Sequence, residues 1–383
     1  MKYLKNFCLF FVTVSIILCA SCGRVPTKPE EQERITIGAL FPLTGTFCDE
    51  GIRALNGLLL ARKDINENGG VLGRQLDVIT LDDRGDPWYV VEQYKALKEK
   101  GVIAIIGSSY SDVTLELAKA AEKDGIPVIS PTASNPEVTK GRENVFRVIF
   151  LDDYQARILA SFAQKTLHAK TALIINGASG RYNRISDIFA EAFRSRGGSI
   201  VAAERYSGPG DFDAILKKYK AKQPDVIFCP TDYMVAAMLA EAAHRNNFDK
   251  TNLLGTDAWD GILTFVHDRD VLDRIYYASP FAFDENTPKV TNFSQNYFDN
   301  FSYTPLSTSA LTYSSVQILT ASIEKAGSTD AEAIINAMKT NVHDIVTGRL
   351  QYDYHNNPNN PHTYVYIMQI KNGYYSSVDK IRI

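Results

Sequence analysis

Apolar residues follow two alternating spacings along most of the chain. Short apolar runs, such as Ile35 to Phe41 and Leu76 to Leu81, are typical of buried strands. Between them, Glu50 to Asn66 carries apolar residues mostly at helical spacing, and Asn68-Gly69-Gly70 then provides typical helix-end chemistry. This order of strand and helix repeats, which predicts mostly parallel sheets with helices on both faces.

The predicted elements form two runs, and the second run starts after Phe146-Arg147. Further strands are predicted at 102–106, 127–130, 171–176, 200–206, 225–228 and 252–254. Further helices are predicted at 89–100, 114–123, 154–166, 184–196, 212–220 and 234–245. The pattern therefore predicts an α/β protein with two doubly wound, mostly parallel-sheet lobes.

The first 33 residues have a different character. Lys2 and Lys5 precede an apolar run from Phe7 to Leu18 that is too short to cross a bilayer core of about 30 Å. Small residues follow, ending in Cys22. This arrangement predicts a signal peptide over 1–21, and it resembles a relaxed bacterial lipobox in which Cys22 becomes acylated. An ordinary signal peptide cut near Ser21 is the alternative.

Residues 22–33 are rich in Pro, Lys and Glu, which is typical of a tether. No later segment contains 18 consecutive apolar residues. We therefore expect an exported body that lies outside the cytoplasm and is anchored to the membrane, periplasmic or at the cell surface, through the lipid on Cys22.

Charge and motif content exclude several function classes. The chain has 41 Lys and Arg against 44 Asp and Glu, a balance that argues against a nucleic-acid binder. The six His are scattered, so no metal site or cofactor is predicted. Cys48 and Cys229 lie far apart in sequence and do not indicate a disulfide framework. Catalytic motifs such as Gly-x-Ser-x-Gly, His-Glu-x-x-His and the phosphate loop are absent.

Candidate binding residues follow the predicted strands. Ligands of doubly wound folds bind beyond the carboxyl ends of the strands. The segments there, which are rich in hydroxyls, glycine and single acids, are 43–45, 107–111, 131–135, 177–182, 230–233 and 255–259. They suit a small polar ligand held by neutral donors and helix N-termini. For any single residue, a turn or helix-cap role is the alternative.

The order of several motifs resembles the periplasmic binding proteins of type I, in particular the leucine/isoleucine/valine-binding class. The resemblance covers about residue 34 to the end. The segments that carry it include Pro42-Leu43-Thr44-Gly45, Asp64-Ile65-Asn66, Asp82-Asp83, Ile105-Ile106-Gly107, Ser130-Pro131-Thr132-Ala133-Ser134, Gly255-Thr256-Asp257 and Thr347-Gly348.

The resemblance implies two lobes that close on a ligand and are joined by three crossovers. These are expected near Val148–Asp153, Tyr277–Phe281 and His343–Thr347. Lobe 1 would then comprise 34–149 and 280–343, and lobe 2 would comprise 150–279 and 344–383. The returning segment from Asp284 to Asn341 is expected to be mostly helical, and the chain from Gly348 onward mostly strand.

The resemblance also implies roles for five residues. Ser111 matches the serine that binds an amino-acid carboxylate, and Thr132 and Ser134 match the pair that supplies backbone and hydroxyl groups. Tyr182 matches an aromatic residue that closes over the ligand. Asp257 matches the acid that accepts the ligand ammonium, where leucine-binding proteins tend to have Glu.

Two positions depart from that pattern. Thr231, with Asp232 beside it, and Glu50 stand where the family often has aromatic residues. Unpaired buried anions are costly, so these acids should face water, a cation such as Arg181, or a polar end of the ligand. We therefore expect a polar or basic amino acid, or an amide, rather than leucine. The alternative is that both acids lie on the cleft rim.

These observations predict a monomeric solute-binding lipoprotein that captures an amino acid or a similar small polar compound. Its partners would be the permease and ATPase subunits of an ABC importer. Two other functions stay open at this point. One is a sensory binding protein that signals to a membrane receptor, and the other is an exported α/β enzyme.

Overall fold

The structure is a computed structural model that describes residues 34–177, 180–266, 269–359 and 364–382, without the side chains of residues 180, 181, 269 and 270. The predicted signal peptide, Cys22 and the tether lie outside the described residues, as does the Arg181 side chain. None of the described helices is long and apolar enough to cross a membrane.

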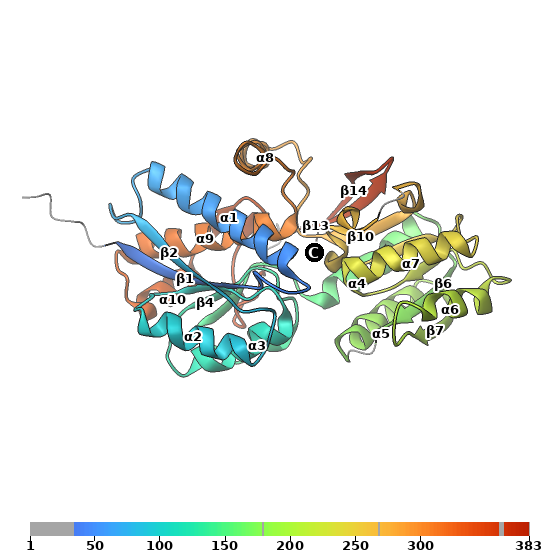
Figure 1. Ribbon diagram of the computed structural model, residues 1–383, viewed down its shortest axis with the longest axis horizontal. Helices are drawn as coiled ribbons and strands as arrows, with labels where there is room; N and C mark the ends of the chain where they lie inside the picture. The colour runs from blue at the N-terminus through green and yellow to red at the C-terminus, as the bar shows by residue number, and fades with distance from the viewer. Residues whose placement is uncertain (1–33, 178–179, 267–268, 360–363, 383) are drawn as a thin grey trace, which may run out of the picture. The chain divides into compact units, whose positions relative to one another are not determined.

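The first lobe is built on a five-stranded sheet in which all strands are parallel (Figure 1). Its strand order is β2-β1-β3-β4-β5. The strands are β1 (Ile35–Phe41), β2 (Leu76–Asp82), β3 (Ile105–Gly107), β4 (Val128–Ser130) and β5 (Val145–Arg147). The helices of the first run are α1 (Cys48–Glu67), α2 (Tyr89–Glu99) and α3 (Ser111–Glu122).

The returning segment is helical, as expected, and packs on the first lobe. It consists of α8 (Pro288–Phe301), α9 (Ser307–Ala326) and α10 (Ala331–Thr340). Helix α9 contacts α1 along its length, and α10 contacts α9. The first sheet thus has α2 and α3 on one face and α1 and α9 on the other (Figure 1).

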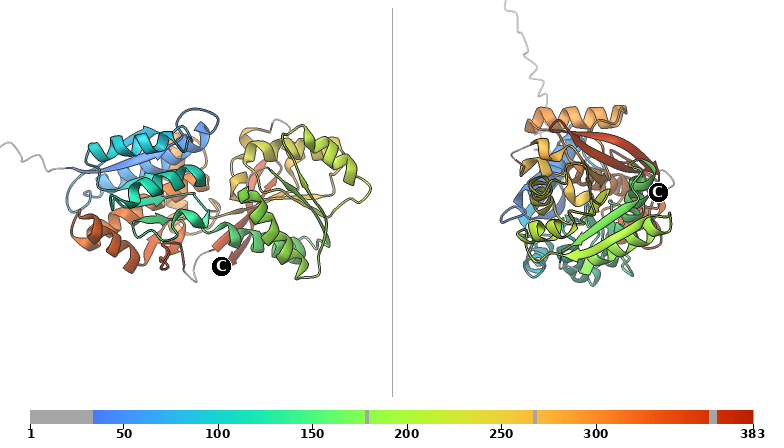
Figure 2. Two further views of the ribbon diagram at one scale, coloured as in Figure 1. Left: turned by 90° about the horizontal axis from the view of Figure 1, so that it is seen from below. Right: turned by 90° about the vertical axis from the view of Figure 1, so that its right-hand side faces the viewer.

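The second lobe is built on a seven-stranded sheet of order β14-β13-β10-β9-β8-β6-β7. Its strands are β6 (Thr171–Asn176), β7 (Ser199–Arg205), β8 (Val226–Phe228), β9 (Asn252–Gly255), β10 (Ile275–Ser279), β13 (Tyr364–Lys371) and β14 (Tyr374–Arg382). Strands β6 to β10 are parallel, while β13 and β14 add in antiparallel fashion (Figure 2). Its helices are α4 (Asp152–Lys165), α5 (Gly180–Arg194), α6 (Asp211–Tyr219) and α7 (Tyr233–Arg245).

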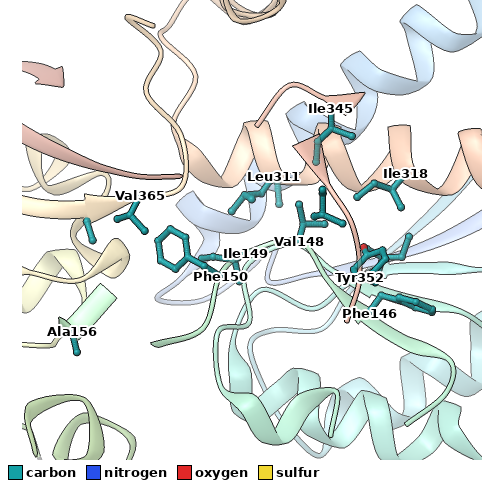
Figure 3. Close-up of a cluster of buried hydrophobic side chains, with 14 of the residues drawn as sticks. Phe146, Val148, Ile149, Phe150, Ala156, Leu311, Ile318, Ile345, Tyr352 and Val365 are labelled. Atoms are coloured by element: carbon teal, nitrogen blue, oxygen red, sulfur yellow. The ribbon is translucent and has the colours of Figure 1, made fainter. Parts of the chain in front are cut away.

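One hydrophobic core runs through both lobes. Because side chains alternate across a strand, Ile37, Ala39 and Phe41 of β1 enter this core while Leu40 packs on the opposite face with α2 and α3. The core joins the α1–α9 face of the first sheet to the α4–α5 face of the second. Val148 and Phe150 in the first crossover connect the two parts (Figure 3).

The segment from His343, where the third crossover was predicted, to Asn357 stays beside the first sheet. Strands β11 (His343–Ile345) and β12 (Gly348–Leu350) pair with each other, and the Tyr352 ring packs 4.9 Å from that of Phe146 in β5. The Asn356 amide donates to the Val145 carbonyl at 3.1 Å, which supplies a partner along the edge strand β5. The predicted division assigned 344–383 to lobe 2. The contacts of the part up to Asn357 lie with lobe 1, whereas β13 and β14 belong to the second-lobe sheet.

Candidate functional site

Loops from both sheets and the start of α9 meet at a small cavity of about 50 Å³. Ser111 and Thr132 line it from the first lobe, Asp257 from the second, and Glu50 from the first turn of α1. The other lining residues are Ser109, Tyr110, Ile149, Ala258, Asp260, Ser307, Thr308 and Leu311. The structure thus brings four of the eight predicted ligand-binding residues together.

Hydroxyl and amide groups gather at the first-lobe side of this cavity. Ser111 is the first residue of α3, is almost fully buried, and its Oγ accepts a hydrogen bond from the Asn135 amide at 3.4 Å. The Thr132 hydroxyl donates to the Ser109 carbonyl at 2.7 Å. The Ser109 hydroxyl is itself buried without a hydrogen-bond partner among the described residues. A helix start with nearby hydroxyls favours an anionic group such as a carboxylate.

The Asp257 carboxylate is positioned by a buried glutamine of the second lobe. The Gln155 side-chain amide donates to Asp257 Oδ1 at 2.7 Å, and its carbonyl accepts from the Asp257 backbone amide at 3.0 Å. Gln155 is fully buried and also donates to Asp152 at 3.0 Å. The sequence reasoning missed Gln155, because its partner lies a hundred residues away in the chain.

Glu50 receives two hydrogen bonds from neutral hydroxyls. Thr308 donates to Oε1 at 3.1 Å and Tyr110 donates to Oε2 at 3.2 Å. Burial raises the pKa of the Glu50 carboxyl above its ordinary value of 4.5, and the charge of Asp260 raises it further. The positive charge of Arg53 opposes this shift without cancelling it. Burial, with Glu50 beside it, likewise raises the pKa of Tyr110 far above its usual range, so Tyr110 stays a neutral donor.

Two hydrogen bonds connect the lobes beside the cavity. Arg53 of α1 donates to the Thr264 hydroxyl at 3.0 Å, and its guanidinium lies 5.9 Å from the Tyr233 ring centroid. Asp260 accepts from the Ser307 amide at the start of α9, at 2.7 Å. Gly261 has a φ of 103°, and a Cβ there would lie 2.7 Å from the Arg53 guanidinium, so this glycine is needed for the close approach.

A larger cavity of about 700 Å³ lies beyond Arg53 and Thr264, which line it together with aromatic side chains. The neighbouring residues Asp49 and Leu306 also line it. It is therefore adjacent to the small cavity, which is lined by Glu50 and Ser307. None of the eight predicted ligand-binding residues is among the described residues that line the larger cavity.

The remaining four predicted residues do not line the small cavity in the described part of the chain. Ser134 is fully buried, and its carbonyl accepts from the Asp152 amide at 3.3 Å. Tyr182 is half-buried against the main core. Thr231 is fully buried, with its hydroxyl 2.6 Å from that of Tyr206. Asp232 caps α7 by accepting from two backbone amides at 3.0 Å each. A capping role is the local alternative that applied to such residues from the sequence.

Comparison with known proteins places this chain among solute-binding proteins of one family. The family model described as "Periplasmic binding protein" matches residues 34–374. A Leu/Ile/Val-binding protein of Rhizobium johnstonii is 28% identical over 343 residues, which cover 85% of this chain and 88% of that protein.

Two solved structures share the fold. One is a branched-chain amino acid transporter substrate-binding protein from Streptococcus pneumoniae in complex with isoleucine, with a TM-score of 0.84, 27% identity, and coverage of 92% of this chain and 99% of that one. The other is a leucine-binding protein from Thermotoga maritima, with a TM-score of 0.82, 26% identity, and coverage of 91% and 99%.

These relatives are solute-binding proteins and not enzymes, so the comparisons confirm the expected binding protein and remove the enzyme alternative. They also confirm the two-lobed α/β fold of type I. The chain belongs to the periplasmic binding protein family.

Proposed function

We propose that this protein is an extracytoplasmic lipoprotein that captures an amino acid between its lobes and delivers it to an ABC importer. The observation that carries the proposal is the cavity at which hydroxyls of the first lobe and a carboxylate of the second lobe meet. The names of the relatives support an amino acid as the ligand class.

The two sides of the cavity suit the two charges of an amino acid. Ser111 and the start of α3 would receive the ligand carboxylate, with Thr132 beside it. Asp257 would accept the ammonium group. In a closed cleft each charged hydrogen bond contributes roughly 1.5–3 kcal/mol, and a micromolar dissociation constant needs about 8 kcal/mol. A few such contacts are therefore sufficient.

Binding must widen the cavity. Typical ligand pockets are about 300–1,000 Å³, so the present 50 Å³ is too small for an amino acid. The interlobe bonds of Arg53 and Asp260 would part as the ligand enters and form again, or be replaced, when the lobes close around it. Tyr182, Ser134, Thr231 and Asp232 would contact a ligand only after such a rearrangement.

A thermal-shift screen with the twenty amino acids tests the binding proposal. A ligand at 100 times its dissociation constant stabilises the folded state by about 2.7 kcal/mol, which gives a clear rise in Tm. Alkyl amines and carboxylic acids of matched size, each with one of the two charged groups, are the controls. An equal response to the controls would contradict recognition of both charges.

Export and anchoring have their own test. The proposal includes acylation of Cys22 and delivery to membrane permease and ATPase subunits by a monomeric protein. Several acyl chains give stable anchoring, because each buried CH₂ contributes about 0.8 kcal/mol. The Cys22→Ala variant should move to the soluble fraction and lose labelling by a fatty-acid probe, and unchanged membrane partition would contradict the anchor.

A further inference from the structure

The described residues that line the small cavity carry an excess of negative charge. Glu50, Asp257 and Asp260 line it, and none of the described lining residues is positively charged. An amino acid's ammonium group accounts for one of these carboxylates, Asp257 under the proposed function. Asp260 is satisfied by the Ser307 amide and by the Tyr277 hydroxyl at 3.0 Å. Glu50, like Asp260, has neutral hydrogen-bond donors, but both of its donors are hydroxyls, which can rotate away when a ligand donor arrives.

The surroundings of Glu50 compensate its charge only in part. Both of its hydrogen-bond donors, Thr308 and Tyr110, are neutral hydroxyls. The charge of Arg53 lowers the pKa of Glu50 without cancelling the effect of burial. The Arg53 guanidinium makes contacts of its own, because it donates to Thr264 across the lobes and lies over Tyr233.

A second observation at the same cavity is independent of these acids. The Ser109 side chain is only 4% exposed, lines the cavity, and its hydroxyl has no hydrogen-bond partner among the described residues. An unpaired buried hydroxyl is costly, and a ligand group that enters the cavity can supply the missing bond. The cavity therefore has an unpaired hydroxyl in addition to a carboxylate whose charge is only partly compensated.

We infer that the preferred ligand is an amino acid whose side chain ends in a cation, and that Glu50 determines this preference. The inference rests on the proposed function, because it assigns the ligand's main-chain charges to Ser111 and Asp257. The cationic group replaces the Tyr110 or Thr308 hydroxyl as a partner of Glu50. A neutral aliphatic side chain at this place would take water from the carboxylate and supply neither a hydrogen bond nor an opposite charge, which selects against leucine.

Calorimetric titration with lysine and norleucine tests the inference, because norleucine keeps the lysine chain without its terminal ammonium. Ornithine, arginine, glutamine and leucine complete the panel. We expect at least one cationic amino acid to bind tenfold or more tightly than norleucine. The Glu50→Gln variant should reduce this ratio to below about threefold, since one charged hydrogen bond is lost. Its amide oxygen can still accept from Tyr110 or Thr308, so the local structure is kept.

Asp49→Asn is the matched control. It removes one negative charge from the adjacent position of α1, but Asp49 lines the larger cavity instead. This variant should keep the preference for the cation. Norleucine, leucine or glutamine as the tightest ligand, with Glu50→Gln unchanged, would overturn the inference and leave amino-acid binding intact. Absence of binding by every amino acid would overturn the proposed function, and the inference with it.

Discussion

Asp257 and Glu50 present carboxylates to the same cavity, but the protein holds them differently. Asp257 is fixed by two hydrogen bonds to the fully buried Gln155 amide. Glu50 is held by two hydroxyls, those of Thr308 and Tyr110. A carboxylate on a rigid amide has one orientation, whereas hydroxyls can rotate and give way to a ligand donor. Under the proposed function, the Asp257 side would recognise what all ligands share and the Glu50 side what differs among them.

Removing Asp257 should have the largest effect. We expect Asp257→Ala to weaken binding of every amino acid by about tenfold to a hundredfold, because a charged hydrogen bond of roughly 1.5–3 kcal/mol is lost. Calorimetric titration measures the effect, and an unchanged Tm of the unliganded protein is the control. If Asp257→Ala weakened binding only of amino acids with certain side chains, Asp257 would determine specificity, and the proposed difference between Asp257 and Glu50 would be wrong.

Gln155 tests whether the orientation of Asp257 matters. Gln155→Met keeps the approximate shape of the side chain without its hydrogen bonds and should weaken binding of all ligands by about fivefold to tenfold. The double variant with Asp257→Ala should bind no more weakly than Asp257→Ala alone, because Gln155 acts through Asp257. Additive losses would show instead that Gln155 acts on the ligand or on the fold.

The sequence predicted the parts of this site that follow a local rule. The segments 107–111, 131–135 and 255–259 each follow a strand, where parallel sheets place ligand residues, and the resemblance singled out Ser111, Thr132 and Asp257 within them, which the structure brings to one cavity. The strand and helix pattern likewise predicted β1 to β4, β6 to β9 and α1 to α7, because parallel strands are continuous apolar runs, but it placed neither β10 nor the elements from α8 onward. The short edge strand β5 was missed because the three residues Val145–Arg147 show no period.

Residues that act through distant partners could not be predicted in this way. Gln155 bonds to a residue 102 positions away, and Arg53 reaches across 211 positions to Thr264. No local pattern encodes such contacts. Asp232 is the opposite case. Its place just before the apolar helix from Met234 predicts a helix cap, and the structure gives it that role.

Arg53 tests how strongly the protein itself compensates the charge of Glu50. Replacing it by methionine removes the hydrogen bond to Thr264 across the lobes and should weaken ligand binding by about twofold to threefold, typical of one exposed hydrogen bond. It should also raise the pKa of Glu50 further, since Arg53 lowers that pKa. Titrations at several pH values measure both effects. Thr264→Val, which removes the bond and keeps the charge, should reproduce the first effect without the second.

The smallest effect concerns the stability of the unliganded protein. Because burial raises the pKa of Glu50, its ionised form is disfavoured in the folded state relative to the unfolded state. Protonated Glu50 therefore stabilises the folded state. This contribution to the free energy of unfolding is fully present below the pKa of 4.5 in the unfolded chain, and it is lost as the pH rises through the higher pKa of the folded protein. Glu50→Gln should therefore raise Tm at pH 7, by on the order of 1 °C.

The pH dependence separates this effect from a general improvement in packing. The Tm difference between Glu50→Gln and the parent should shrink on acidification and vanish below about pH 4, where Glu50 is neutral in both states. Asp49→Asn, which removes a charge from the adjacent position of α1, is the control in differential scanning calorimetry. A difference that stays constant from pH 7 to pH 4, or a Glu50→Gln variant less stable than the parent at pH 7, would show that Glu50 is compensated within the protein. The Glu50 carboxylate would then need no cation from the ligand. Glu50 and Asp257 would differ only in where they lie around the cavity.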